Sequence, residues 1–368
     1  MDLPDGTLLG VARGGAGHLG IEGRLDAIRS KDGGRTWTPP ATIVDSSWDD
    51  RDHALGVTPA GTVILAYMAD NQFDDAGNYF QLPRSPDDYP RIEVYVTRST
   101  DGGLTWTRPF LRQVESLRTA SHFGKMTVLA DGTILQPTYD SARRAVIGDR
   151  IGEVRENAFC SYIVRSSDDG LTWGEPVLLL PNTNESTLLA LLGGDVLAVA
   201  RGDNPSGLSS THSSDGGRTW SAPSAITGPG QHPADLSLLA NGDVLLTYGN
   251  RNPPYRVEGR VSRDGGRTWL EPTLVLSGQL YGYHLAGPRP QDMGYPSTAF
   301  VRDGAGRRGV TLYYYNPSLN HSPTYAEVER RKLYKKDNSP FYSVRDYRTV
   351  AISWSEAELI DAIGRAGG

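Results

Sequence analysis

The chain has 368 residues, 22% of them charged, and a formal net charge of −6. This charge gives no basic footprint for nucleic acid, and no apolar run approaches the roughly 18 residues of a membrane span. One cysteine, Cys160, excludes an intramolecular disulfide, and the 43 glycines and 24 prolines are typical of strands joined by turns.

The N-terminal stretch predicts a strand and turn from the outset. Met1 is followed at once by the turn Asp5-Gly6-Thr7, so the sequence as written predicts no signal peptide and a cytoplasmic protein. Nothing before Leu3 can form the innermost strand of a first sheet. Because an open ring of sheets exposes edges, we expect the true start to lie upstream, where a leader for secretion could also lie.

One turn sequence, which we call the box, occurs five times with the pattern S-x-D-x-G-x-T-W. In such a turn Asp accepts backbone N–H bonds, Gly supplies a positive φ and Trp packs a hairpin onto the core. The boxes therefore predict β-hairpins and have a structural role. They span residues 30–37, 99–106, 166–173, 213–220 and 262–269.

A second repeat alternates with the boxes: a tight glycine turn followed by an apolar run typical of a strand. Six such turns and five boxes predict six four-stranded blades, which close into a β-propeller. We therefore expect an all-β single domain over residues 1–368. The apolar runs are 8–12, 63–67, 134–139, 196–201, 244–248 and 310–315.

The strand order predicts two unlike faces. Because consecutive strands are antiparallel, the glycine turns and the boxes share one face, and the remaining loops gather on the other. Loop-rich faces of rigid scaffolds are where sites are usually found. The chain then ends in a short helix over 355–363, opened by the capping box Ser355 to Glu358. The long loops are 71–89, 141–156, 280–294 and 317–345.

Each inner strand carries polar residues near the loop face, where the predicted blades converge. These are the candidate site residues: Asp49, Asp50, Arg51, Asp52 and His53; His122 and Lys125; Asn184, Glu185 and Arg201; His232, Asp235, Arg251 and Arg256; and Asp292, Tyr295 and Ser297.

Boxes on a six-bladed propeller resemble the sialidase (neuraminidase) superfamily, in which this turn is known as the Asp-box. Sialidases carry a Glu on one inner strand and an Arg at the end of the next strand, and Glu185 and Arg201 lie sixteen residues apart. The Tyr295-Pro-Ser297 stretch is similar to the motif that opens their last blade. The resemblance implies Tyr295 as nucleophile and Glu185 as the base that activates its phenol.

The resemblance also implies three arginines that hold the substrate carboxylate with their planar forks. Arg201 matches one of them and Arg251 or Arg256 the next, whereas the first belongs to the absent strand. The loop that holds the acid/base Asp of sialidases has none here, so Glu22, His18 or Asp52 would act instead. The further substrate-binding candidates are Arg51, Lys125, His122, His232, Asp235 and Asp292.

Structural roles stay open for several of these residues. Arg51 and Asp52 could form an ion pair between blades, and His232 and Asp235 could bond neighbouring backbone. Tyr295 could be a core tyrosine. The run Tyr313-Tyr314-Tyr315 is expected to pack within a strand and not to form a sugar platform.

Three functions compete. The first is an exo-acting, sialidase-like glycoside hydrolase that cleaves a terminal acidic sugar. The second is a polysaccharide lyase, with His122 or His232 abstracting a proton from a uronate and Tyr295 as acid. The third is a non-catalytic carbohydrate-binding propeller. All three predict a carbohydrate partner; no metal-ligand spacing is present, so no cofactor is expected, and the oligomeric state is left open.

Overall fold

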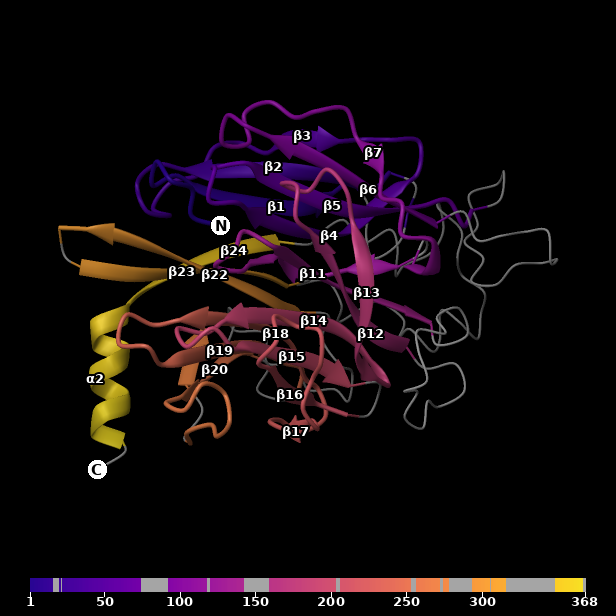
Figure 1. The fold of residues 1–368 in the computed structure, drawn as a ribbon. Helices are drawn as coiled ribbons and strands as arrows, with labels where there is room; N and C mark the ends of the chain where they lie inside the picture. The colour runs from indigo at the N-terminus through magenta and orange to yellow at the C-terminus, as the bar shows by residue number, and fades with distance from the viewer. Residues whose placement is uncertain are drawn as a thin grey trace.

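The computed structural model describes residues 1–15, 20, 22–73, 92–117, 120–141, 159–202, 206–252, 256–271, 274–277, 293–304, 306–315 and 348–366. Over these ranges the chain is nearly all β: six sheets follow one another along the sequence, and one helix ends the chain (Figure 1). The predicted β class is confirmed.

Sheets one to three contain the first half of the chain. Sheet one consists of β1 (Leu8–Gly14), β2 (Arg24–Ser30) and β3 (Ala41–Val44). Sheet two consists of β4 (Asp49–Val57), β5 (Val63–Asp70), β6 (Ile92–Ser99), β7 (Phe110–Leu111) and β9 (Gly124–Lys125). Sheet three consists of β8 (Ser121–His122), β10 (Thr127–Val128), β11 (Ile134–Ser141), β12 (Phe159–Ser166) and β13 (Gly174–Pro181). A 3₁₀ turn, Glu115–Leu117, precedes sheet three.

Sheets four to six contain the second half. Sheet four consists of β14 (Thr183–Ala190), β15 (Val196–Gly202), β16 (Leu208–Ser213) and β17 (Ser224–Ala225). Sheet five consists of β18 (Gln231–Leu238), β19 (Val244–Asn250), β20 (Arg256–Ser262) and β21 (Leu274–Ser277). Sheet six consists of β22 (Met293–Asp303), β23 (Gly306–Tyr315) and β24 (Arg348–Ser355), before helix α2 (Glu356–Ala366).

The second strand of each sheet supplies much of the core. β5 and β19 are buried along their whole length, because sheets pack against both of their faces. Leu135 and Ile163 of sheet three share one cluster with Leu188 and Val196 of sheet four. The apolar runs that the sequence predicts as strands therefore supply the side chains that pack between neighbouring sheets.

The boxes form the predicted turns. In the fourth copy Asp215 accepts bonds from the backbone N–H groups of Arg218 and Thr219, each at 2.9 Å, and from the Thr219 hydroxyl at 2.6 Å. The Ser213 hydroxyl donates to Asp215 and accepts from the N–H of Gly217, which has a φ of 78°. These bonds hold the carboxylate in its charged form, and the pKa of the first-copy Asp32 is lowered chiefly by the bond from the Thr36 hydroxyl.

The boxes also join one sheet to the next, which the sequence reading did not foresee. The residue before the box Ser reaches the box of the following sheet. Arg165 donates to the carbonyl oxygen of Gly216 at 2.8 Å, and His212 Nε2 donates to that of Gly265 at 2.8 Å. Arg29 donates to Gly102 in the same way, and Arg308 of sheet six donates to Gly33 of sheet one at 3.2 Å.

In the third box the acceptor of the bond from the preceding sheet is a side-chain carboxylate and not a backbone carbonyl. Its additional aspartate, Asp169, has a φ of 60° and accepts bonds from Arg98 and from the Thr62 hydroxyl of sheet two. Since Thr62 belongs to a glycine turn, this contact agrees with the expectation that turns and boxes share one face.

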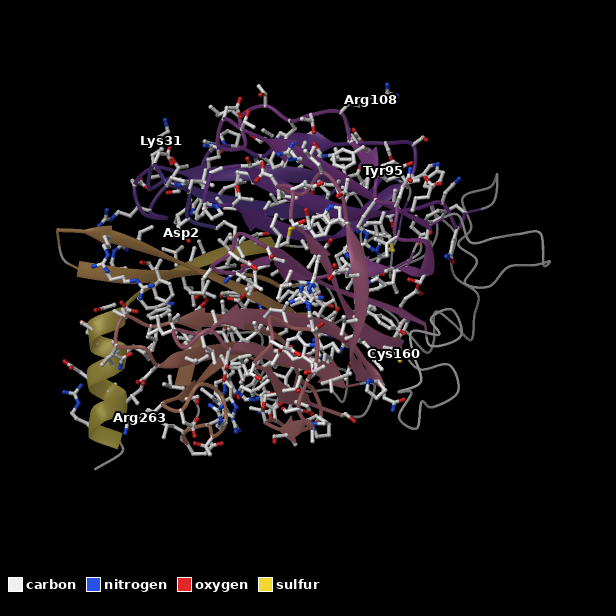
Figure 2. The ribbon with its side chains drawn as sticks, viewed as in Figure 1. Asp2, Lys31, Tyr95, Arg108, Cys160 and Arg263 are labelled. Atoms are coloured by element: carbon white, nitrogen blue, oxygen red, sulfur yellow. The ribbon has the colours of Figure 1, made fainter. Side chains whose placement is uncertain are left out.

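Helix α2 joins sheets five and six, where no box is available. The buried carboxylate of Glu356 accepts a bond from the N–H of Ala240 in sheet five at 2.9 Å and one from Arg307 of sheet six at 2.5 Å. Arg263, labelled beside the helix in Figure 2, donates to the carbonyl of Ile363 at 3.3 Å. The predicted cap is confirmed: Ser355 Oγ accepts from the N–H of Glu358 at 3.3 Å.

Sheet one has three strands in the described part of the chain. The residues before β1 pair with it only over its beginning: Met1 and Leu9 exchange two backbone bonds, and Asp2 bridges to Leu8. None of the described helices combines the length and the apolar composition needed to cross a membrane.

The junction at Glu356 gives a stability prediction. Glu356→Ala leaves Arg307 without its carboxylate and the N–H of Ala240 without an acceptor, so we expect a loss of about 1–3 kcal/mol in the free energy of unfolding. Chemical denaturation measures it. Asp361→Ala, an exposed position on the same helix, is the matched control, and equal effects of the two substitutions would contradict this role of Glu356.

Candidate active site

The candidate residues emerge from bulges at one level of four inner strands. In each case two residues of the inner strand oppose a single residue of the second strand, and such bulges re-aim side chains. The pairs are Asp52-His53 on β4, Asn184-Glu185 on β14, His232-Pro233 on β18 and Tyr295-Pro296 on β22.

Backbone conformation at these bulges is unusual. Asp52 and Tyr295 have φ values of 45° and 51°, in the left-handed region that side chains with a Cβ seldom adopt. Beside Tyr295, Gly294 has a φ of 111°, and a Cβ on it would lie 3.0 Å from the Cα of Gly249. Both glycines therefore allow sheets five and six to approach closely next to the Tyr295 side chain.

Glu185 lies at the centre of the site. Its Oε2 accepts a bond of 2.7 Å from Arg201 Nη1, and its Oε1 accepts a short bond from the Tyr295 phenol. Glu185 is buried, with 8% of its surface exposed. A buried carboxylate is costly unless it is paired, and here both oxygens have partners.

The Tyr295 ring is enclosed by aromatic and cationic groups. Tyr314 stacks on it with ring centroids 5.2 Å apart, and Phe123 meets it edge-on at 5.2 Å. The Arg251 guanidinium lies 5.6 Å from the ring centroid, and Arg251 Nε donates to the carbonyl of Met293 at 3.1 Å.

Electrostatics keep the phenol protonated at rest. Burial, and then the charge of Glu185, raise the pKa of Tyr295 well above its ordinary value. Although burial opposes its charge, the Glu185 carboxylate raises the pKa of Arg201. Tyr295 is thus a neutral donor whose proton has one adjacent acceptor, the carboxylate of Glu185.

A second cluster of polar side chains lies around Asp52. Arg51 Nε donates to Asp52 Oδ1 at 3.3 Å, and the phenol of Tyr139 donates to Asp52 Oδ2 at 3.4 Å. The buried Asp49 pairs with Arg13 at 2.5 Å and with Arg51 at 3.8 Å. Arg51 and Asp52 therefore pair within β4 and not between two blades as the sequence left open, whereas Arg13 and Asp49 form an ion pair between sheets one and two.

These two groups line one hollow of about 330 Å³, which we call the central pocket. Arg51, Asp52, Glu185 and Tyr295 lie on its polar part. The rest of its wall is largely apolar and comes mainly from β1 and β23. Arg13 also lines the pocket, whereas Arg201 and Arg251 lie behind the Glu185–Tyr295 pair and are not part of the wall.

Lys125 and Asp235 form an ion pair between sheets two and five. Lys125 Nζ, which lines the pocket, donates to Asp235 Oδ2 at 2.8 Å and to the carbonyl of Thr298 at 2.6 Å. Asp235 also accepts from the N–H of Thr298 at 2.8 Å and is buried. This arrangement favours the structural role that the sequence left open for Asp235.

The two histidines proposed as lyase bases are both neutral. Burial, together with Arg201 and Arg251, lowers the pKa of His232 to about 2. Burial, and then Arg112, lower the pKa of His122 well below its ordinary value. An imidazole with so low a pKa is a weak base for abstracting a proton from carbon.

The remaining candidates lie away from this cluster. Arg256 pairs with Glu258 at 2.5 Å and does not line the central pocket. Glu22 is exposed and does not line it either. Asp292 and His18 lie outside the described residues, as do most of the four long loops. Within the described ranges no three His, Cys, Asp or Glu side chains are grouped to hold a metal ion.

Four residues of the site were missed from the sequence: Arg13, Phe123, Tyr139 and Tyr314. Arg13 is the penultimate residue of β1, which the sequence predicts as the second strand of its sheet and not as an inner strand. Phe123 stands between the predicted candidates His122 and Lys125, and Tyr139 ends the predicted run 134–139. Tyr314 was assigned to strand packing; instead it is half-buried and lines the central pocket beside Tyr295.

The structure pairs a tyrosine and a glutamate from two inner strands of a β scaffold. This is the class of protein that the sequence resemblance implies. The chain belongs to the BNR repeat-like domain family, whose model matches residues 27–307, and so to the sialidase superfamily. It is 28% identical over 240 residues to a sialidase of Clostridium perfringens, an alignment that covers 59% of this chain and 58% of that protein.

Solved structures share the fold. A protein of unknown function from Dyadobacter fermentans matches with a TM-score of 0.66 and 25% identity over 86% of this chain and 88% of its own. Trypanosoma rangeli sialidase, in complex with 2,3-difluorosialic acid as a covalent intermediate, matches with a TM-score of 0.63 and 14% identity. That match covers 98% of this chain and 54% of the trypanosomal one.

The electrostatics of the site predict that His232 stays neutral. Its folded-state pKa lies below the unfolded value near 6.5, so its contribution to stability is complete above pH 6.5 and declines as the pH falls below it. In an NMR titration, with His232→Asn for assignment, we expect no midpoint between pH 5 and 8. A midpoint near 6.5 would show that burial and the neighbouring arginines do not lower the pKa of His232.

Proposed function

We propose that the protein is a retaining exo-glycoside hydrolase that removes a terminal acidic, sialic-acid-like sugar from a glycan. The six sheets would be the blades of a propeller, with the polar part of the central pocket on the face opposite the boxes and its apolar part reaching Trp37 of the first box. The observation that carries the proposal is the hydrogen-bonded chain from Tyr295 through Glu185 to Arg201. Family membership supports the reaction class, since sialidases are the glycosidases with a tyrosine nucleophile.

The first step would use the Tyr295 phenol. Its oxygen forms a bond to the anomeric carbon while its proton passes to Glu185, which already accepts that hydrogen bond. The bond from the anomeric carbon to the leaving-group oxygen breaks, with the electron pair staying on that oxygen. Arg201 stabilises the charged form of Glu185 before the transfer. The same ion pair lowers the basicity of Glu185 toward the Tyr295 proton.

Asp52 is the acid that the geometry favours. The leaving-group oxygen needs a proton, and Asp52 lines the central pocket together with Tyr295, whereas the exposed Glu22 does not. In the first step Asp52 gives its proton to that oxygen. In the second step water attacks the anomeric carbon while Asp52 takes a proton from that water. The bond from the anomeric carbon to the Tyr295 oxygen then breaks, its electron pair stays on that oxygen, and Glu185 returns the proton to it.

Arginines supply the acidic-sugar preference. Arg13 and Arg51 lie on the pocket wall, where a substrate carboxylate can reach them, whereas Arg201 and Arg251 contact Glu185 and Tyr295 from outside the wall. A planar guanidinium binds a carboxylate bidentately, so a sugar acid is favoured over a neutral sugar. The lyase alternative loses support because both of its candidate bases have strongly lowered pKa values.

Removing either member of the central pair should abolish hydrolysis. For Tyr295→Phe and Glu185→Gln we expect losses of at least about 10³-fold in kcat/KM on fluorogenic acidic-sugar glycosides, with the fold retained by circular dichroism. Tyr67→Phe, a buried tyrosine of sheet two outside the pocket wall, is the control. Full activity of Tyr295→Phe would refute the nucleophile, and an inactive parent protein on every acidic glycoside would favour a binding propeller.

The role of Asp52 can be tested with the leaving group. Asp52→Asn removes the proton donor, so hydrolysis of an unactivated sialyl-oligosaccharide should fall about 10²–10⁴-fold, whereas a 4-methylumbelliferyl glycoside, whose leaving group needs less protonation, should lose far less. Steady-state kinetics on the two substrates gives the ratio. An equal loss on both would contradict the acid role, and Glu22→Gln serves as the comparison.

A further inference from the structure

The tyrosine run on β23 divides between two environments. Tyr313 also borders the central pocket, but it is 2% exposed and packs in the core with Val257 and Met293. Tyr314, the next residue, points to the other face of the strand, is half-buried and lines the central pocket. Packing within the strand therefore accounts for Tyr313, and Tyr314 requires another explanation.

Tyr314 makes a face-to-face contact with Tyr295. The two rings have centroids 5.2 Å apart and an interplanar angle of 28°, in the range of offset stacking. Phe123 holds the same ring from a second direction, with an interplanar angle of 76°. Tyr314 pairs in register with Gly294, the residue before Tyr295, so its position is fixed by the β-ladder next to the bulge.

The backbone alone gives Tyr295 little orientation. Its φ of 51° is strained, its strand is interrupted there by the bulge, and among the described residues its phenol is held by a hydrogen bond to Glu185. That bond changes direction during the reaction, because protonated Glu185 becomes the donor and the Tyr295 oxygen a weaker acceptor. Once the Tyr295 oxygen carries a sugar it has no proton to donate, and the ring contacts then remain to hold the side chain.

We propose that Tyr314 is a positioning residue that keeps the Tyr295 ring aligned with Glu185 and with the anomeric carbon through both steps. The inference rests on the proposed function, because it assigns Tyr314 a part in the chemistry of Tyr295. It concerns the aromatic ring of Tyr314 and not its hydroxyl group.

The test compares three variants by steady-state kinetics on one acidic-sugar glycoside. Tyr314→Leu removes the ring, and we expect kcat to fall about 10- to 100-fold with KM changed by less than about threefold, because a small misplacement of a reacting group is costly whereas substrate contacts remain. Tyr314→Phe retains the ring and should recover most of the lost kcat.

Tyr95→Leu is the matched control. Tyr95 stacks on Tyr67 at 5.8 Å and 22°, a similar pair in sheet two that does not line the central pocket, and it is labelled in Figure 2. We expect Tyr95→Leu to lower the melting temperature about as much as Tyr314→Leu while kcat stays at the parental value. Should Tyr314→Leu fail to fold, Tyr314→Met removes the ring at similar volume.

Other results would overturn the inference. A parental kcat in the ring-less variants would do so, as would a raised KM with unchanged kcat, which would make Tyr314 a substrate contact. An equal loss in Tyr314→Phe would assign the effect to the hydroxyl. If the parent protein cleaves no acidic glycoside, or if Tyr295→Phe is fully active, the proposed function fails first and the inference fails with it.

Discussion

The buried carboxylate of Glu185 is the constraint on which the site depends. Away from water it must be paired on both oxygens, and the chain meets this need with Arg201 from the neighbouring strand and with the Tyr295 phenol from sheet six. Burial of Tyr295 and then the charge of Glu185 raise the pKa of Tyr295, and burial of His232 together with Arg201 and Arg251 lowers the pKa of His232. Structure and reactivity therefore have one cause, since the partners that make Glu185 tolerable also make it the acceptor of the Tyr295 proton.

Glycine turns followed by apolar runs predicted the strands, because these patterns are local properties of the chain. The resemblance to sialidases singled out Glu185, Arg201 and Tyr295, and the structure brings these three side chains into contact. The bulges were not foreseen, since they depend on how two strands pair. A signal was available: proline inside a strand is confined to edges and bulges, and Pro233 and Pro296 each follow a candidate residue. The aromatic neighbours Phe123 and Tyr314 were missed because only polar residues were searched.

The boxes illustrate a similar limit. Their internal hydrogen bonds follow from eight consecutive residues and were predicted correctly. Their contacts with the preceding sheet join residues 51 positions apart for Arg165 with Gly216, 73 for Arg29 with Gly102 and 275 for Arg308 with Gly33, and no single repeat contains both partners. Where the sixth box is absent, Glu356 of α2 joins sheets five and six. These contacts stabilise the ends of the sheets that carry the boxes, whereas the reactive groups lie at the bulges near the beginnings of the inner strands.

The most direct test of the central claim is covalent trapping. The reagent is a 2,3-difluorinated sialic acid, as in the trypanosomal structure. The Tyr295 oxygen should displace fluoride from its anomeric carbon and form a covalent bond there, and the second fluorine should slow hydrolysis of that bond. Intact-mass measurement should show one added sugar less hydrogen fluoride, and peptide mapping should locate it on Tyr295. An adduct on another residue, or no adduct in a preparation that hydrolyses acidic glycosides, would contradict the account.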